Sequence, residues 1–317
     1  MTIEKNMEYV VGVDLGGTKI ATALLDRNGK VLRRVRYETA PLKSAAEVID
    51  SLVESVNEVR GDFPIVGIGV ASPGAVDTER GIILNGTNLP EWVEIPLQQE
   101  METRLGIPVK VANDANVAAW GEYYAGAGKN SKTMVYVTIS TGIGSGIVLD
   151  GKLLVGSNGF AGELGHTIIG QEGPLCSCGQ VGCWEAYASG TSIARLAAEA
   201  VGSKKSLMTE LAAQDGTAIG AKHVFQAASL GDEVASAVVD EVTSAIALGL
   251  KNVVHTFNPD CIVIGGGVSL AGDELFSPVL KKTKKLVMEP YRETFRIAPA
   301  KLGDDVGVVG AATLCFA

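Results

Sequence analysis

Apolar runs that alternate with polar turns mark most of the first half of the chain and predict a mixed α/β fold. Residues 9–14, 20–25 and 31–37 are β-rich apolar runs, and the polar stretch 26–29 separates the last two. Residues 45–60 place apolar side chains at the spacing of an amphipathic helix. Farther along we expect a strand at 65–70, a loop through 85–94, a helix near 97–105, a strand at 108–112 and a helix from 113 to 124.

The second half repeats this pattern and then becomes largely helical. We expect strands at 133–139 and 146–149, helices over most of 184–257, a strand at 261–264 and a closing helix at 305–314. The longest helix has an apolar face, which comprises Val234, Val238, Val242, Ile246, Leu250 and Val253.

Each half opens with a strand, a turn that contains glycine and threonine, and a second strand. The two turns are Asp14-Leu-Gly-Gly-Thr18 and Ser140-Thr-Gly-Ile-Gly144. A chain of 317 residues is long enough for two domains, each with its own core. This repeated pattern therefore permits two α/β lobes with a glycine-rich turn on each side of a shared cleft.

Composition and charge exclude several classes of function. The net charge of −9 argues against a surface for a nucleic-acid backbone, which needs clustered Lys and Arg. The polar residues 1–8 resemble neither a signal peptide nor a transit sequence, and no apolar run reaches the length that spans a bilayer. We therefore expect a cytoplasmic protein with no nucleic-acid or membrane partner.

The turn at 14–18 has the chemistry of a phosphate site. Gly16 and Gly17 let backbone amides approach an anion. The Thr18 hydroxyl adds a donor, and Asp14 suits a water bound to Mg²⁺. The turn lacks the Gly-x₄-Gly-Lys-Ser/Thr nucleotide pattern, however, and a glycine pair in a hairpin is as often structural.

A second turn and a third glycine-rich segment strengthen the case for a nucleotide. The second turn comprises Thr141, Gly142 and Gly144, and the third segment is Gly265, Gly266 and Gly267, directly after the expected strand at 261–264.

Asn113 and Asp114 stand at the expected start of a helix. An aspartate at this position stays ionised, because the helix dipole and free amides favour its anion. Such a carboxylate can accept the proton of a hydroxyl during phosphoryl transfer. The alternative, from the residues alone, is that Asp114 only caps the helix.

Three of the five cysteines lie within eight residues, shortly after His166. They are Cys176, Cys178 and Cys183. Thiolate and imidazole are the ligands that zinc prefers, and four of them close a tetrahedral structural site. A cluster of core thiols and a disulfide are the alternatives, but the ligand types and spacing favour zinc.

Four polar residues in loops suit the hydroxyl groups of a polyol, namely Asn88, Glu163, His166 and Glu185. Carboxylates and amides bind hydroxyls through paired hydrogen bonds. We expect His166 to serve twice, with one ring nitrogen on zinc and the other toward a ligand.

Together these motifs resemble the ROK sugar kinases and repressors, a family of the actin-like ATPase superfamily. The resemblance is closest to the glucose-phosphorylating branch, because Asn88 lies in an Asn-Leu-Pro-x-Trp setting. It runs nearly end to end, through 14–18, 113–114, Gly162-Glu-Leu-Gly-His166, the block from Cys176 to Glu185 and 265–267.

The resemblance implies an organisation and an activity. It implies two actin-like, ribonuclease H-like domains with a cleft between them. The first would cover 1–112, with the C-terminal helix at 304–317 packing back on it, and the second 113–303 with the zinc loop. The implied reaction is phosphorylation of glucose to glucose 6-phosphate by ATP with Mg²⁺, in a homodimer, with Asp114 as general base.

The resemblance also implies the ligand contacts. The sugar would bind Gly74, Asn88, Asn113, Asp114, Glu163, His166 and Glu185. The nucleotide would bind Asp14, Gly16, Gly17, Thr18, Thr141, Gly142 and Gly144 through its phosphates and Gly265, Gly266 and Gly267 through its nucleoside. A structural zinc ion would bind His166, Cys176, Cys178 and Cys183.

Two alternatives stay open. A kinase for N-acetylmannosamine, N-acetylglucosamine, mannose or fructose would use the same residues. A sugar-responsive transcription regulator of the family would carry a DNA-reading segment first, for which Asp14 comes too early in this acidic chain. One departure from the family pattern is Ser140, where many members have glycine, so the second turn is expected to be narrower.

Overall fold

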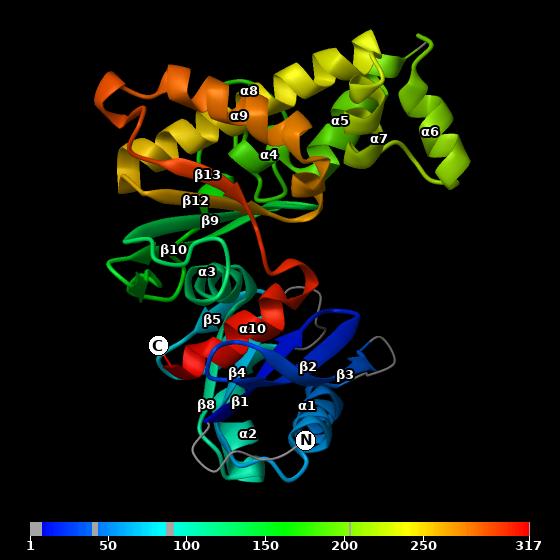
Figure 1. Cartoon of the computed structure of the whole chain (residues 1–317). Coiled ribbons are helices and arrows are strands. Elements are labelled where there is room, and N and C mark those ends of the chain that lie inside the picture. Colours follow the sequence, from blue (N-terminus) through cyan, green and yellow to red (C-terminus); the bar gives the residue numbers. More distant parts are fainter. Residues whose placement is uncertain (1–7, 40–43, 87–91, 203, 317) are drawn as a thin grey trace. The chain divides into compact units, whose positions relative to one another are not determined.

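The computed structural model describes residues 8–39, 44–86, 92–202 and 204–316 of the chain. The chain divides into two compact units, whose segments can be followed by colour in Figure 1. The first unit comprises residues 1–130, 146–162 and 301–317, and the second comprises 131–145 and 163–300. Among the described residues, no helix is both long and apolar enough to cross a membrane.

A five-stranded sheet forms the centre of the first unit, with the order β3-β2-β1-β4-β8. β1 pairs antiparallel with β2 and parallel with β4, while β3 and β8 extend the sheet at its two edges. The expected strands are confirmed as β1 (Tyr9–Leu15), β2 (Lys19–Asp26), β3 (Val31–Glu38), β4 (Ile65–Ser72) and β8 (Val109–Asn113).

Helices cover both faces of this sheet, because successive side chains of a strand point to opposite faces. On one face, α1 (Ala45–Arg60) and α2 (Leu97–Leu105) pack on the strands, with Leu52 fully buried. On the other face lies α10 (Val306–Thr313) (Figure 1). Its Val309 is buried against the sheet. Burial of each such side chain contributes about 1.5–3 kcal/mol.

Glycines allow α10 to lie close to β1 and to α3 (Asp114–Tyr124). A Cβ atom at Gly12 would lie 1.9 Å from the carbonyl oxygen of Val308, and one at Gly310 would lie 2.1 Å from that of Val117. This packing explains why α3 and the C-terminal segment group with the first unit. The family resemblance implies a domain boundary at 112/113, before α3, whereas the compact units of the structure first divide at 130/131.

Three short strands form a separate sheet that the apolar pattern did not indicate. They are β5 (Ala75–Asp77), β6 (Ile82–Asn85) and β7 (Val93–Ile95), in the order β5-β6-β7. Strands of three or four residues are too short for alternation to stand out. The expected loop through 85–94 ends in β7, and its residues 87–91, with Asn88, lie outside the described residues.

A second five-stranded sheet has the order β11-β10-β9-β12-β13 and so repeats the order of the first. Its strands are β9 (Thr133–Ile139), β10 (Ile143–Leu149), β11 (Lys152–Leu153), β12 (Cys261–Gly265) and β13 (Arg296–Pro299), and β9, β12 and β13 are parallel. β10 begins at 143 rather than at 146, so the connection from β9 is shorter than expected. The strand-turn-strand pattern that occurs in both halves of the sequence thus corresponds to two sheets with the same strand order.

The second unit is otherwise mainly helical. Its helices are α4 (Trp184–Ala188), α5 (Gly190–Val201), α6 (Leu207–Asp215), α7 (Ala221–Ser229), α8 (Glu233–Phe257) and α9 (Asp273–Leu286). The 3₁₀ segments of the chain are η1 (Leu164–His166), η2 (Gly267–Ala271), η3 (Glu289–Tyr291), η4 (Gly303–Asp305) and η5 (Leu314–Phe316).

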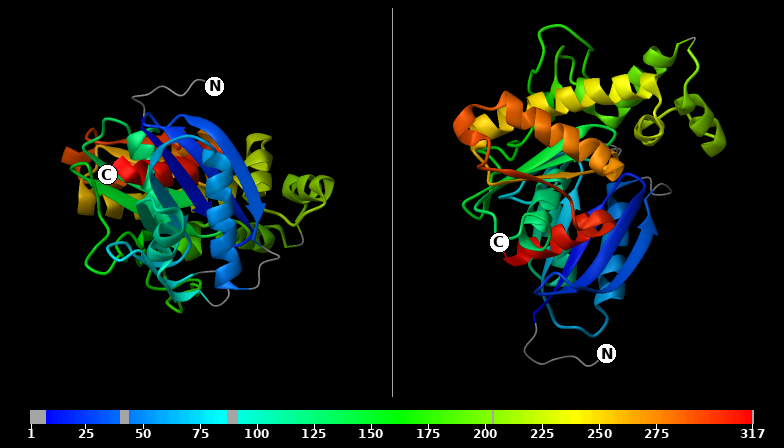
Figure 2. Two further views of the ribbon diagram at one scale, coloured as in Figure 1. Left: turned by 90° about the horizontal axis from the view of Figure 1, so that it is seen from below. Right: turned by 45° about the horizontal axis from the view of Figure 1, so that its top comes forward.

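α8 and α9 lie side by side (Figure 2). Lys282 of α9 joins them, since its Nζ donates to the carbonyl oxygen of Asp240 at 2.6 Å and to the hydroxyl of Thr243 at 2.9 Å. The expected apolar face of α8 is confirmed: Val238, Val242, Ile246, Leu250 and Val253 are buried and Val234 is half-buried.

Candidate active site and metal centre

The turn between β1 and β2 holds the first set of predicted phosphate contacts. The amide of Gly16 donates to the carbonyl oxygen of Lys19 at 2.9 Å and closes the turn. Thr39, after β3, supports it: its amide donates to the carbonyl oxygen of Thr18 at 2.9 Å and its hydroxyl to that of Gly16 at 3.1 Å. Gly17 and Thr18 are exposed at the tip of this fixed turn.

Asp14 lies half-buried at the end of β1, beside the start of α10. A glycine at 307 makes room for it, because a Cβ atom at Gly307 would lie 2.5 Å from Cγ of Asp14. Burial raises the pKa of Asp14 above its usual value; the charge of Asp114 raises it further, and Lys19 opposes the shift. A cation bound here would relieve both the desolvation and the repulsion.

Asn113, rather than Asp114, is the N-cap of α3. Its Oδ1 accepts from the amides of Ala115 and Asn116 at 2.9 and 3.4 Å, and its Nδ2 donates to the carbonyl oxygen of Gly74 at 2.9 Å. Asp114 is the first helical residue; it is exposed, and its Oδ1 accepts from the amide of Ala115 at 2.8 Å. The capping role belongs to Asn113, and the helix N-terminus favours the Asp114 anion.

The second glycine turn is tied to α4 by Glu185. Oε2 of Glu185 accepts from the amide of Ile143 at 2.8 Å, and a Cβ atom at Gly142 would lie 2.4 Å from the same oxygen. Only glycine at 142 therefore lets this carboxylate reach the turn. Thr141 is exposed, and its carbonyl oxygen accepts from the hydroxyl of Thr191 at 2.9 Å. A residue predicted to contact sugar thus also shapes a turn predicted to bind phosphate.

The three glycines after β12 have different surroundings. A Cβ atom at Gly265 would lie 2.4 Å from the hydroxyl of Tyr136, and one at Gly266 would lie 2.4 Å from the carbonyl oxygen of Ile139, so both are needed for packing on β9. A Cβ atom at Gly267 would have no neighbour within 4 Å. Gly267 lines a cavity of about 460 Å³ together with Phe225, Gln226, Val268, Leu270 and Glu274.

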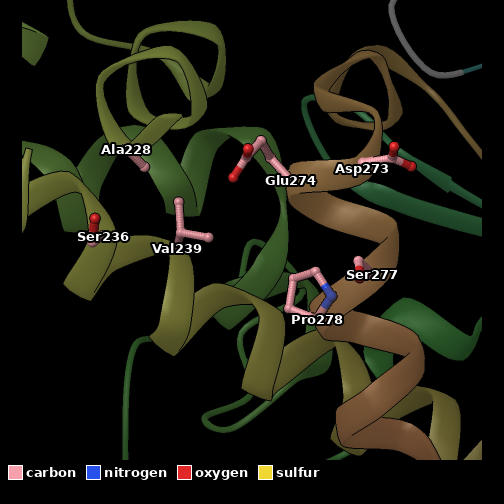
Figure 3. A pocket seen from close by; sticks show the side chains of 7 residues that line it. All are labelled: Ala228, Ser236, Val239, Asp273, Glu274, Ser277 and Pro278. Carbon is pink, nitrogen blue, oxygen red and sulfur yellow. The ribbon is translucent and has the colours of Figure 1, made fainter. Parts of the chain in front are cut away.

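A second cavity, of about 500 Å³, was not indicated by the sequence. It lies among α7, α8 and α9 and is lined by Ala228, Ser236, Val239, Asp273, Glu274, Ser277 and Pro278 (Figure 3). Figure 3 shows the carboxylate of Glu274 on the side of Ala228 and Val239, while that of Asp273 points away. None of the predicted site residues lines this space.

The predicted zinc ligands converge. Their ligand atoms all lie within 4.8 Å of one another. Sγ of Cys176 is 3.5 Å from Nδ1 of His166, and Sγ of Cys178 is 3.6 Å from Sγ of Cys183. A tetrahedral zinc ion with Zn–S of about 2.3 Å and Zn–N of about 2.0–2.1 Å sets sulfurs about 3.8 Å apart and N···S at about 3.5–3.6 Å.

The donor set and these separations therefore fit one zinc ion. All five cysteines are free. The sulfur separation of 3.6 Å between Cys178 and Cys183 also exceeds the disulfide bond length of about 2.05 Å, so the disulfide alternative does not describe this structure.

His166 points its two ring nitrogens at different neighbours. Nδ1 faces the thiol of Cys176, and Nε2 lies 4.0 Å from Oε2 of the exposed Glu163. This orientation allows Nδ1 to bind a metal ion while Nε2 faces a ligand, as predicted for His166. Glu185 adds a further link, since its Oε1 accepts from the hydroxyl of Ser177 at 3.2 Å, within the cysteine loop.

The predicted residues thus form two groups, one on each unit. The first unit carries Asp14, Gly16, Gly17, Thr18, Gly74, Asn113 and Asp114; the second carries Thr141, Gly142, Gly144, Glu163, His166, Cys176, Cys178, Cys183, Glu185 and Gly265–Gly267. Thr39, Ser177 and Gly307 support these groups but were not predicted. Thr39 contacts Gly16, Ser177 contacts Glu185, and Gly307 leaves room for Asp14 because it has no Cβ. The apolar pattern along the chain does not indicate any of these three relationships.

Two sheets of one strand order, each with a glycine turn after its central strand, define an actin-like protein of two domains. The model of the ROK family matches residues 10–317, so the chain belongs to the ROK family.

Relatives resemble the chain over almost its whole length. A glucokinase of Thermotoga maritima is 39% identical over 308 residues, which cover 96% of each chain. An N-acetylmannosamine kinase of Salmonella heidelberg is 36% identical over 305 residues, 96% of this chain and 97% of the relative. The structure of a ROK family glucokinase from Streptomyces griseus in complex with glucose and AMPPNP is 36% identical, covers 96% of this chain and 98% of that one, and has a TM-score of 0.79.

Proposed function

We propose that this protein transfers the γ-phosphoryl group of ATP to the 6-hydroxyl of glucose. Membership in the ROK family and the similarity to glucokinases over 96% of the chain support the reaction. The observation that carries the proposal is Asp114, an exposed carboxylate at the first position of α3 and electrostatically coupled to Asp14.

Asp114 acts as the general base. The 6-oxygen of the sugar attacks the γ-phosphorus while its proton passes to the carboxylate of Asp114. The bond from the γ-phosphorus to the bridging oxygen of the β-phosphate breaks, and ADP leaves. Asn113, the residue before Asp114, supports this step. The oxygen of its side-chain amide caps α3, and the nitrogen of the same amide donates to the carbonyl oxygen of Gly74.

Asp14 and the two glycine turns bind the phosphate end of the nucleotide. The Mg²⁺ that accompanies ATP supplies positive charge to the phosphates during transfer. Asp14 would hold it through a bound water, which also lowers the cost of the half-buried carboxylate. Gly16 to Thr18 on the first unit and Thr141 to Gly144 on the second offer backbone amides and hydroxyls to the phosphates.

The nucleoside end occupies the cavity beside Gly267. Its volume of about 460 Å³ and its lining by Phe225, Val268 and Leu270 suit an apolar purine ring, and Gln226 supplies a polar group. Gly265 and Gly266 contribute indirectly, by allowing β12 to pack on β9 and so placing Gly267.

The sugar hydroxyls bind polar groups from both units. Glu163, the Nε2 atom of His166 and Glu185 act from the second unit, and Asn113, Gly74 and Asn88 act from the first. Glu185 and His166 each have a second partner in the structure, so sugar contacts are linked to the phosphate turn and to the cysteine loop.

Nδ1 of His166 and the three thiolates would hold a structural zinc ion. Four protein ligands complete a tetrahedron, which leaves no open position for water activation. Held through Nδ1, His166 would keep its ring fixed and present Nε2 to the sugar. The protein acts as a homodimer, a proposal that rests on the family resemblance and that light scattering at micromolar concentration tests directly.

Initial rates with a panel of hexoses test the choice of sugar. With MgATP, glucose should give the highest kcat/KM. N-acetylmannosamine is the second candidate, because a relative of that activity is 36% identical over 96% of this chain. A higher kcat/KM for N-acetylmannosamine than for glucose would overturn the choice of glucose. N-acetylmannosamine would then be the substrate, and the mechanism would stay the same.

A further inference from the structure

Glu122, near the end of α3, is a carboxylate that the proposed chemistry does not use. It is fully buried. Its Oε2 accepts from the amide of Ala127 at 2.7 Å, and its Oε1 accepts from the amides of Lys301 and Leu302, both at 2.8 Å. A buried carboxylate that accepts three amides forms charge-assisted hydrogen bonds, the stronger kind in proteins.

These amides belong to two of the segments that connect the units. The chain leaves the first unit at 130/131 and returns to it at 300/301. Ala127 precedes the first of these crossings, and Lys301 and Leu302 follow the second. One side chain therefore holds both crossings on the side of the first unit. The backbone adds to this, since the amide of Gly128 donates to the carbonyl oxygen of Glu122 at 2.9 Å.

The second unit holds the same two segments from its own side. Asp260 accepts from the amides of Lys132 and Thr133 at 3.0 and 2.9 Å. The amide of Ala300 donates to the carbonyl oxygen of Ile264 at 2.9 Å. In the first crossing, residues 129–131 lie between the hydrogen-bonded residues of the two units. In the second crossing, Ala300 and Lys301, which carry such hydrogen bonds, are consecutive.

Glu122 shares α3 with the proposed base. Asp114 and Glu122 are eight residues apart, so a rise of about 1.5 Å per residue sets them about 12 Å apart on one helix. Reacting atoms must approach to about 3–3.5 Å, and a misplacement of about 1 Å can lower a rate about 100-fold.

We propose that Glu122 is a positioning residue, which fixes the two crossing segments to the helix that carries Asp114 and so sets where the base stands for each transfer. The proposal rests on the proposed function for its kinetic consequence, but the anchoring of the amides does not.

Glu122→Gln tests it with little change of shape. A glutamine has one oxygen that accepts and one NH₂ group that donates. Either the amide of Ala127 or those of Lys301 and Leu302 would therefore face the NH₂ group, which cannot accept their hydrogen bonds. Glu102→Gln is the matched control, because Oε1 of Glu102 also accepts a backbone amide, that of Val109 at 2.9 Å, in the same unit but away from the crossings.

Two further variants keep the test decisive if Glu122→Gln does not fold. Asp260→Asn removes one of two amide contacts at an exposed residue on the second unit. Gly126→Ala places a Cβ atom 2.1 Å from Oε2 and 2.8 Å from Cα of Glu122, so it displaces the carboxylate and the backbone beside it without removing the carboxylate.

The measurements are hydrogen exchange of peptides over 125–133 and 297–304, and kcat at a temperature where each variant is folded. We expect Glu122→Gln to speed exchange in both peptides and to lower kcat about 10- to 100-fold. Asp260→Asn should speed exchange at 132–133 and lower kcat several-fold. Glu102→Gln should lower the melting temperature and leave kcat within about 2-fold of the wild type.

Faster exchange with an unchanged kcat would overturn the positioning role, and so would an equal loss of kcat in Glu102→Gln. Unchanged exchange in Glu122→Gln would show that the carboxylate does not hold the crossings. If the wild-type protein phosphorylates no sugar, the proposed function fails, and the exchange data still decide whether Glu122 anchors both segments.

Discussion

Nδ1 of His166 lies 3.5 Å from Sγ of Cys176, at the separation of two ligands of one zinc ion. The ring is therefore oriented so that its other nitrogen, Nε2, lies near Glu163 rather than among the cysteines. This geometry links the cysteine loop to a group proposed to bind sugar, and it predicts that the metal affects sugar recognition without taking part in the chemistry.

Cys178→Ala should remove the zinc, lower the melting temperature and raise the KM for glucose more than the KM for ATP. The physical reason is that the ion fixes the ring of His166, while the nucleoside cavity is lined by other residues. Metal analysis and steady-state kinetics are the measurements. Cys261→Ala, at a buried cysteine of β12, is the control and should keep its zinc. A fully active wild-type protein without zinc would contradict the role of the metal.

Asp114→Asn should lower kcat by about 10²–10⁴-fold while sugar binding stays largely intact, because the amide cannot accept the proton. Asp232→Asn is the matched control. Asp232 also stands at a helix start, where its Oδ1 accepts from the amide of Ala235 at 2.8 Å. The control should change stability little and leave kcat unchanged, because Asn caps a helix about as well as Asp does. Near-normal turnover in Asp114→Asn would remove this residue as the base.

Asp14→Asn should lower activity about 10²–10³-fold and yet raise stability at pH 7 when Mg²⁺ is absent. Burial first, and then the charge of Asp114, raises the pKa of Asp14 above 3.8. The folded state therefore binds this proton more tightly than the unfolded state does. The stability that protonation contributes is fully present below pH 3.8 and is lost as the pH rises through the folded-state pKa.

The melting temperatures of Asp14→Asn and the wild type should therefore differ most near neutral pH and converge as the pH falls toward 3.8. Thermal unfolding across this pH range is the measurement. A variant that is less stable than the wild type at pH 7 would show that the carboxylate is not strained in its site.

Gly267→Leu should raise the KM for ATP about 10-fold and leave the KM for glucose nearly unchanged. A side chain here extends into the cavity of about 460 Å³, and a loss of about 1.4 kcal/mol corresponds to that factor. Ala228→Leu creates the same side chain in the other cavity and should not alter the KM for ATP (Figure 3). Equal effects of the two variants would place the nucleoside elsewhere.

Periodicity and turn chemistry predicted most elements of both sheets and the long helix α8, since each has a sustained apolar pattern. They missed β5, β6 and β7, which are too short to show alternation. The domain boundary at 112/113 was implied by the family resemblance and stays a prediction, whereas the compact units first divide at 130/131. That boundary depends on how closely two helices approach. The approach becomes visible only when Gly310 is found against the backbone of Val117.

The candidate site was predicted unevenly. The zinc ligands were predictable because four metal-binding side chains lie within eighteen residues of one another. The double contact of Glu185, which reaches Ile143 and Ser177, was not predictable. The contact with Ile143 joins segments that are far apart in the chain, so no local sequence pattern indicates it.

The most direct test of the proposed reaction is ³¹P NMR of the protein with MgATP and glucose. For this reaction we expect glucose 6-phosphate and ADP to appear in equal amounts, ATP to stay intact when glucose is omitted, and Asp114→Asn to form almost none of either product. Phosphate on another hydroxyl, or release of inorganic phosphate without a sugar phosphate, would contradict it.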